Sequence, residues 1–139
     1  MSLKTQDLFD VSNKVVVVTG GSRGIGEMIT SGFLANNSKV YITARKEVSQ
    51  KYSCECIPVS GDISNSEGID ALVNFLNDAE PEGIDFLINN AGAAWGANYD
   101  DFPESGWDKV IDLNLKTPFF LTQKLTPLLE KKGTTEDPS

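Results

Sequence analysis

The chain has 139 residues, 40% of them hydrophobic, and a formal net charge of −8, which together describe one acidic globular domain with a core of its own. The acidic balance argues against a nucleic-acid surface, and no apolar run approaches the roughly 18 residues that a membrane-spanning helix needs. The first ten residues hold no apolar signal core, so we expect a cytoplasmic protein that contacts neither nucleic acid nor membrane. The sequence contains no histidine, which excludes a Ser-His-Asp triad within the chain.

The first predicted strand is the apolar run Val15 to Val18, which leads into a glycine-rich turn, TGGSRGIG, and then into a helix that continues to Ala35. We expect apolar residues 25, 28, 29 and 33 to form the buried face of this helix. The glycines at 20, 24 and 26 let another group approach the backbone closely. Free amides at the helix start, with the helix dipole, favour an anion, so the turn predicts a phosphate site.

Three further strands are predicted from β-rich runs at residues 39–44, 54–59 and 85–88. Ser64 and Glu67 have the spacing of a capping box and predict the start of a helix after the third strand. That strand carries Cys54 and Cys56, whose side chains would share one face. A metal site would need more ligands nearby, so we expect a buried structural role and no metal.

The last third of the chain predicts a loop and a long helix. Asn89-Asn-Ala-Gly92 opens a loop rich in glycine and alanine, which follows the fourth strand. Ser105 and Asp108 again have capping-box spacing, and an apolar helical pattern spans 107–129. Pro118 and Pro127 are expected to bend this helix.

Strands that alternate with helices predict a parallel sheet of right-handed βαβ units, which is an α/β fold of the doubly wound Rossmann type. Ligands of such sheets bind beyond the carboxyl ends of the strands, where the strand order reverses. Both glycine clusters, at 20–26 and 89–96, follow the carboxyl end of a predicted strand. Their positions therefore support the interpretation of the first cluster as an anion site.

Three elements in this order, Thr19-Gly20-x-x-x-Gly24-x-Gly26, Asn89-Asn-Ala-Gly92 and Asn114, resemble the short-chain dehydrogenase/reductase family. Their glycine spacing differs from the general G-x-G-x-x-G fingerprint. Within the family, VTGGSRGIG, INNAGAAWG and GWDKVIDLNL are most similar to the 3-oxoacyl-carrier-protein reductase type, especially the form linked to rhamnolipid synthesis in bacteria. The resemblance implies that residues 1–139 are the N-terminal, cofactor-binding portion of a single Rossmann-fold domain.

The resemblance also implies a nicotinamide dinucleotide at the carboxyl edge of the sheet. Its pyrophosphate and adenosine ribose would be lined by Gly20, Ser22, Arg23, Gly24, Ile25 and Gly26. The adenine would be contacted by Asp62 and Ile63, with the carboxylate accepting from the adenine amino group. The residues beside the cofactor would be Asn90, Ala91 and Gly92.

The family's helix asparagine corresponds to Asn114, which would help to hold a water in a proton relay. From the residues alone, Asn114 could instead be only a helix-bend residue, and Asp62 could simply begin the cap of the next helix. Asn89 is expected to tie neighbouring backbone together rather than to touch a ligand.

The end of the second predicted strand bears on the choice of cofactor. An acid at that point binds the ribose 2′-hydroxyl and repels a 2′-phosphate, whereas here the strand ends Thr43-Ala44-Arg45-Lys46, with Ala44 where the acid is expected. Arg45, together with Arg23, could grip a phosphate dianion through bidentate contacts. The sequence therefore favours NADPH, although Arg45 and Lys46 could also form only a solvated loop.

The chain departs from the family pattern in two ways. Family chemistry uses a tyrosine with a lysine four residues later, but Tyr41, Tyr52 and Tyr99 are followed at that spacing by arginine, cysteine and proline. The family's catalytic serine would lie beyond residue 139. The link from Lys46 to Ser53 is also shorter than the roughly 10–12 residues that a parallel crossover needs. We therefore expect an incomplete fold of four strands, with a shortened helix between the second and third strands and the C-terminal half missing.

Two functions remain open from the sequence. The first is the NADPH-binding portion of a short-chain oxidoreductase that reduces a small-molecule carbonyl, such as a 3-oxoacyl thioester of fatty acid metabolism, and that forms a homo-oligomer when intact. The alternative is a non-catalytic truncated Rossmann fragment that binds nucleotide or a partner without turnover. A peroxisomal destination also stays open, because the sequence does not report a C-terminal address signal.

Overall fold

The computed structural model describes residues 4–46, 48, 53 and 55–135. At its centre lies a parallel sheet of four strands in the order β3-β2-β1-β4. The strands are β1 (Val15–Val18), β2 (Lys39–Ala44), β3 (Cys56–Ser60) and β4 (Phe86–Ile88). The predicted α/β fold of Rossmann type is confirmed, and the strand order reverses between β1 and β4.

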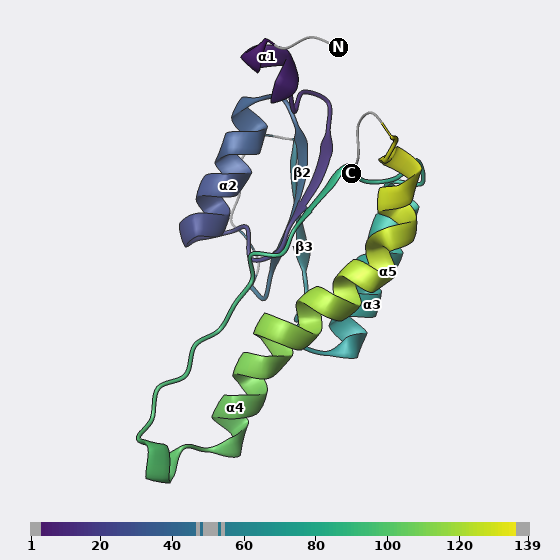
Figure 1. Cartoon of the computed structure of the whole chain (residues 1–139). Coiled ribbons are helices and arrows are strands. Elements are labelled where there is room, and N and C mark those ends of the chain that lie inside the picture. The colour runs from purple at the N-terminus through teal and green to yellow at the C-terminus, as the bar shows by residue number, and fades with distance from the viewer. Residues whose placement is uncertain (1–3, 47, 49–52, 54, 136–139) are drawn as a thin grey trace.

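Helices cover both faces of the sheet (Figure 1). On one face lies α2 (Gly24–Ala35), and on the other lie α3 (Ser66–Ala79) and α5 (Thr117–Lys132), while the short α1 (Thr5–Leu8) precedes β1. The valines of β1 alternate between the two resulting cores, because successive strand side chains point to opposite faces. All four are buried, which explains why this strand reads as a continuous apolar run.

The residues between β4 and α5 form an arm that extends beyond the carboxyl ends of the strands (Figure 1). The arm, defined here as residues 89–111, contains an extended loop, the 3₁₀ turn η1 (Tyr99–Asp101) and α4 (Glu104–Ile111). A π-helical stretch, η2 (Asp112–Lys116), joins α4 directly to α5. The predicted long helix is therefore present, with a π-helical interruption just before Pro118. Such interruptions are frequent at functional sites.

Asp85 ties the start of β4 to the start of β1, although it was predicted to lie inside the fourth strand. Its carboxylate accepts a hydrogen bond from the Val15 amide (2.8 Å) and pairs with the Lys14 ammonium (3.3 Å). Its own amide donates to the Val15 carbonyl (2.8 Å). Because Asp85 is buried, these partners compensate for the desolvation of its charge. The contacts hold together the two strands between which the strand order reverses.

Two predicted helix caps are wrong. The N-cap of α3 is Asn65 rather than Ser64, since Asn65 has the extended backbone of a cap and its side chain accepts from the Gly68 amide (2.8 Å). The α4 helix begins at Glu104, after Pro103, without a side-chain cap, so Ser105 lies inside the helix.

The buried face of α2 also differs from the prediction. Ile29 and Phe33 pack against the sheet, but Ile25 and Met28 are 71% and 73% exposed. The fully buried positions of this helix are Gly26 and Thr30. The helix approaches the turn before it so closely that only small residues fit there, which an apolar periodicity does not reveal.

Several predictions concern the link between β2 and β3. Most of this link, including residues 47, 49–52 and Cys54, lies outside the described residues. The prediction of a shortened helix in this link therefore concerns residues that the structure does not describe. Cys56 is buried, and burial raises the pKa of its thiol, which fits the predicted structural role. Within the described ranges, no group of three His, Cys, Asp or Glu side chains is placed to hold a metal ion. The same residues contain no helix that is long and apolar enough to cross a bilayer.

Candidate functional site

The turn between β1 and α2 lies at the carboxyl edge of the sheet, next to the point where the strand order reverses. Gly20 and Gly24 have φ values of 65° and 57°, in the left-handed region that glycine adopts without strain. The Gly20 amide donates to the Thr43 hydroxyl of β2 (3.0 Å), which fixes the turn to the neighbouring strand. The first amides of α2 have no partners within their helix, and the helix dipole makes this end partly positive. This geometry fits a phosphate group.

Gly26 lets the first turn of α2 lie directly against the preceding backbone. A Cβ atom at this position would be 2.2 Å from the Gly20 carbonyl oxygen and 2.5 Å from the Asn90 side-chain nitrogen. A Cβ at Gly20 would be 3.1 Å from the Cα of Ala91. The two glycine clusters, which are far apart in the sequence, therefore meet at this edge.

Thr19, at the end of β1, links the two clusters and was not among the predicted site residues. Its hydroxyl accepts from the amides of Asn90 (3.0 Å) and Ala91 (2.9 Å) and donates to the Ile88 carbonyl (3.3 Å). The Asn90 side chain in turn donates to the carbonyls of Thr19 (2.9 Å) and Gly20 (3.3 Å). The sequence signal for this role was the place of Thr19 at the start of the family pattern, directly before the glycine turn, and the structure shows that the residue is buried.

The two asparagines that follow β4 make different contacts, and the predicted role of Asn89 is wrong. It is Asn90, and not Asn89, that ties neighbouring backbone together, because the Asn89 side chain donates instead to the Thr122 hydroxyl of α5 (3.0 Å). The structure thus assigns opposite contacts to two adjacent residues. Alternation of side chains along an extended segment explains this difference, since neighbours point to opposite sides.

Asn114 lies in η2 and anchors the arm. Its side-chain oxygen accepts from the Ala93 amide (2.7 Å), and its nitrogen donates to the Ala93 carbonyl (2.9 Å). Each of these atoms retains a second hydrogen-bonding position, and the residue is exposed, so a water can still be bound. Gly92 lies close by, since a Cβ there would be 3.3 Å from the Asn114 oxygen.

A second contact holds the arm loop against α4. The indole of Trp95 lies on Gly106, where a Cβ would be only 2.6 Å from the ring, and the Lys109 ammonium lies 5.2 Å from the ring centroid. Together with the Asn114 contact, this fixes the extended loop at two points.

Asp62 and Ile63 follow β3 at the same edge of the sheet. The Asp62 carboxylate accepts from the Ser64 amide (3.0 Å), and hydrogen bonds from the side chain and backbone of Ser64, with the charge of Arg45, lower the pKa of Asp62. Ile63 is buried, and its carbonyl accepts from the Thr117 hydroxyl (2.6 Å). The Ile63 side chain belongs to the core and is therefore not exposed at the edge of the sheet.

Gly68 is a further position that the sequence did not single out. A Cβ on this residue, in the first turn of α3, would lie 1.8 Å from the Asp62 carbonyl oxygen. The close approach fixes the backbone of Asp62 against the helix.

The remaining predicted residues lie at the rim of the turn. Arg23 is the extended N-cap of α2 and is exposed, as is Arg45 just after β2, while Ser22 is half-buried. The structure therefore brings all the predicted site residues to the carboxyl edge of the sheet, with both arginines open to solvent.

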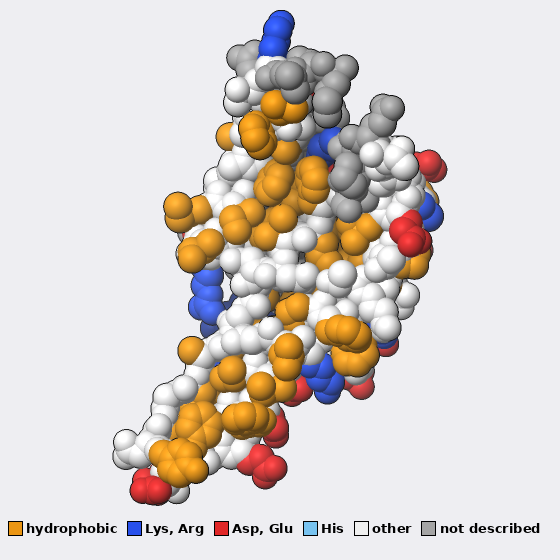
Figure 2. Space-filling model, viewed as in Figure 1, with side chains coloured by type: hydrophobic (Ala, Val, Ile, Leu, Met, Phe, Trp, Pro, Cys, Tyr) orange, Lys and Arg blue, Asp and Glu red, His pale blue; other side chains and the backbone are white. Residues whose placement is uncertain are grey.

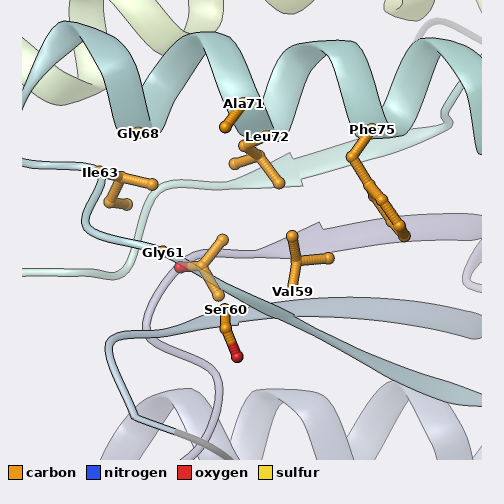
Figure 3. Close-up of a pocket in the computed structure, with 9 residues that line it drawn as sticks. Val59, Ser60, Gly61, Ile63, Gly68, Ala71, Leu72 and Phe75 are labelled. Atoms are coloured by element: carbon orange, nitrogen blue, oxygen red, sulfur yellow. The ribbon is translucent and has the colours of Figure 1, made fainter.

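A pocket of about 190 Å³ lies between α3 and the sheet (Figure 3). Leu72 and Phe75 point from α3 toward the strands, with Val59 of β3 opposite them. No charged side chain lines it within the described part of the chain, and it does not lie at the N-terminus of α2, where the glycine turn ends. The glycine turn, and not this pocket, is the candidate anion site.

Residues 14–135 match the short chain dehydrogenase family. The chain belongs to this family. A curated relative, the rhamnolipids biosynthesis 3-oxoacyl-[acyl-carrier-protein] reductase of Pseudomonas aeruginosa, is 37% identical over 94% of the chain and 54% of the relative. The predicted family resemblance is thereby confirmed.

Solved structures of short-chain dehydrogenases share the fold. The Pseudomonas aeruginosa RhlG/NADP active-site complex has a TM-score of 0.85 and 36% identity, over 92% of this chain and 52% of that one. A short-chain dehydrogenase from Leptospira borgpetersenii with bound NAD⁺ has a TM-score of 0.82 and 28% identity, over 96% and 52% of the two chains. The chain thus spans about half the length of the short-chain dehydrogenases that it matches.

Proposed function

We propose that residues 1–139 are the N-terminal, NADPH-binding portion of a single Rossmann-fold domain in a short-chain carbonyl reductase. The observation that carries this proposal is the glycine turn at the point where the strand order reverses, with the N-terminus of α2 at its end and two exposed arginines at its rim. When bound, the nicotinamide cofactor supplies a hydride to the carbonyl carbon.

Each predicted residue has a role in this proposal. The pyrophosphate and the adenosine ribose would be held by Gly20, Ser22, Arg23, Gly24, Ile25 and Gly26. Asp62 and the backbone of Ile63 would contact the adenine, and the cofactor would lie beside Asn90, Ala91 and Gly92. Asn114 would help to hold a water that takes part in proton transfer.

The choice of NADPH rests on the end of β2. The strand ends at Ala44, which has no carboxylate to bind a ribose 2′-hydroxyl, and the exposed Arg45 follows it. The RhlG structure contains NADP, whereas the Leptospira structure contains NAD⁺, so family membership alone leaves the cofactor open. Arg45 is therefore the residue on which the choice of NADPH depends.

Replacing Arg45 with alanine is expected to weaken NADPH binding by roughly tenfold or more, since a charge-assisted hydrogen bond contributes about 1.5–3 kcal/mol. NADH binding should change little, because NADH has a hydroxyl in place of the 2′-phosphate. Fluorescence titration of both nucleotides measures the two dissociation constants. Lys131→Ala is the matched control, as it removes an exposed positive charge that contacts Pro81, away from the turn. An equal loss of affinity for both nucleotides in Arg45→Ala would contradict the proposed contact between Arg45 and the 2′-phosphate.

We propose that the substrate of the intact protein is a 3-oxoacyl thioester or a similar small carbonyl compound, as in fatty acid metabolism. The similarity to a 3-oxoacyl reductase over nearly all of this chain supports this class. The alternative is a non-catalytic fragment that binds nucleotide or a partner, and the absence of a Tyr-x-x-x-Lys motif from the 139 residues favours it for the chain alone.

The chain alone is therefore expected to bind NADPH without oxidising it. General acid catalysis needs a positioned proton donor, and none of the three tyrosines has the family's lysine. The absorbance of reduced nicotinamide is followed with an acetoacetyl thioester present, against a blank without protein. A protein-dependent loss of absorbance that scales with protein concentration would establish turnover and remove the non-catalytic alternative.

We further propose that the intact protein is a homo-oligomer. Large apolar side chains are exposed on the arm and the start of α5 (Figure 2), including Trp107 at 61% and Phe119 at 63%. A contiguous apolar surface of this kind is typical of a protein–protein contact.

A further inference from the structure

We propose that Asp62 is a specificity-determining residue, whose carboxylate opposes the grip of Arg45 on a 2′-phosphate and so limits the preference for NADPH over NADH. This inference rests on the proposed function, because it concerns the same nucleotide site. It assigns to Asp62 a role beyond contact with the adenine.

The strand register brings Asp62 and Arg45 to the same place. Ala44, at the end of β2, pairs with Ser60, at the end of β3. The Gly61 amide continues the ladder by donating to the Ala44 carbonyl (3.1 Å). Arg45 and Asp62 therefore leave neighbouring strands at one edge, and both side chains are exposed there.

The Asp62 carboxylate is held in position rather than free to turn away. It accepts from the Ser64 amide (3.0 Å), and the close approach of Gly68 fixes the Asp62 backbone against α3. The lowered pKa of Asp62, caused first by the hydrogen bonds from Ser64 and also by the charge of Arg45, keeps the carboxylate ionised at neutral pH. A fixed negative charge thus lies at the same sheet edge as the cation that is proposed to bind a dianion, and the two charges influence each other.

Two effects then weaken the binding of a 2′-phosphate. The carboxylate repels the dianion directly, and its negative charge offsets part of the attraction that Arg45 exerts on the phosphate. NADH has no charge at this position, so its binding is insensitive to both effects. Because the side chains are exposed, water and salt screen the charges, and we expect a change of several-fold rather than of orders of magnitude.

The test measures the ratio of the NADH and NADPH dissociation constants in the wild-type chain and in Asp62→Asn. Both nucleotides carry the same adenine. The loss of an adenine contact, or a general loss of folded protein, would therefore weaken both by the same factor and leave the ratio unchanged. Asparagine keeps an oxygen that can accept from Ser64. The ratio is expected to rise by about three- to tenfold at low salt and to fall back as salt is added.

Asp70→Asn is the matched control, because it removes the same charge from α3 at an ion pair with Lys124. It should leave the ratio unchanged. In the double variant Arg45→Ala/Asp62→Asn the ratio should rise much less than in Asp62→Asn alone, since no arginine at position 45 then holds the 2′-phosphate at this edge. Asp62→Ser, which also retains an acceptor, repeats the measurement should Asp62→Asn fail to fold.

The outcomes separate the two proposals. A wild-type chain that prefers NADPH through Arg45, but whose ratio is unchanged or lower in Asp62→Asn, overturns this inference and leaves the proposed function intact. An equal rise in Asp70→Asn overturns it as well, because the effect would then be a general one of net charge. A wild-type chain that binds neither nucleotide overturns both.

Discussion

Alanine at Gly26 is expected to destabilise the protein by about 3 kcal/mol and to abolish measurable NADPH binding. The added methyl group would be 2.2 Å from the Gly20 carbonyl oxygen and 2.5 Å from the Asn90 side chain. The first of these neighbours is backbone and the second is held by two hydrogen bonds, so neither can move without opening the turn. Chemical unfolding followed by circular dichroism measures the stability, and fluorescence titration measures the binding.

Gly32→Ala, in the same helix, is the matched control for Gly26→Ala. Nothing lies within 4 Å of a Cβ at Gly32. Alanine there removes only the flexibility of glycine and is expected to stabilise the protein by about 0.5–1 kcal/mol. The same substitution at two positions of one helix should thus change the free energy of unfolding in opposite directions. If Gly26→Ala were as stable as Gly32→Ala, the close contact between α2 and its turn would be refuted.

Valine in place of Thr19 is expected to cost about 1–3 kcal/mol of stability and to weaken nucleotide binding. Valine has nearly the same shape but leaves the Ala91 amide without its acceptor. The Asn90 amide keeps its second acceptor, the Ile88 carbonyl (3.0 Å), which limits the loss. Because the hydroxyl joins the glycine turn to the Asn90–Gly92 loop, both sides of the proposed cofactor site should loosen together.

Thr19→Ser keeps the hydroxyl but removes the methyl group. The variant therefore distinguishes the effect of the hydrogen bonds from that of the packing of the methyl group. We expect this variant to keep most of the nucleotide affinity. Hydrogen exchange provides a local measurement, with faster exchange expected at the Ala91 amide in Thr19→Val than in Thr19→Ser. Equal exchange and equal affinity in the two variants would show that the hydroxyl does not link the clusters.

The strands and the glycine turn could be predicted because their signals are local. Four consecutive valines indicate a strand buried on both faces, and such a strand in this fold is followed by the turn at which ligands bind. The family pattern then added Asn90 and Asn114, which the structure shows bonded to the backbone of Thr19 and of Ala93, while their roles toward a cofactor stay predictions. Helix caps were predicted less well, because Asn65 and Ser64 are both acceptable caps and only the backbone conformation selects Asn65.

The sequence by itself determined the order of the elements, the site of the glycine turn and the family. Only the tertiary structure decided which distant groups meet: Thr19 with Ala91, Ala93 with Asn114, and Ala44, which precedes Arg45, with Ser60 at the end of β3. These contacts depend on strand order, on register and on how closely a helix approaches the sheet. A local pattern of residues reports the conformation of its own segment, whereas such contacts join segments that become neighbours only when the whole sheet has formed.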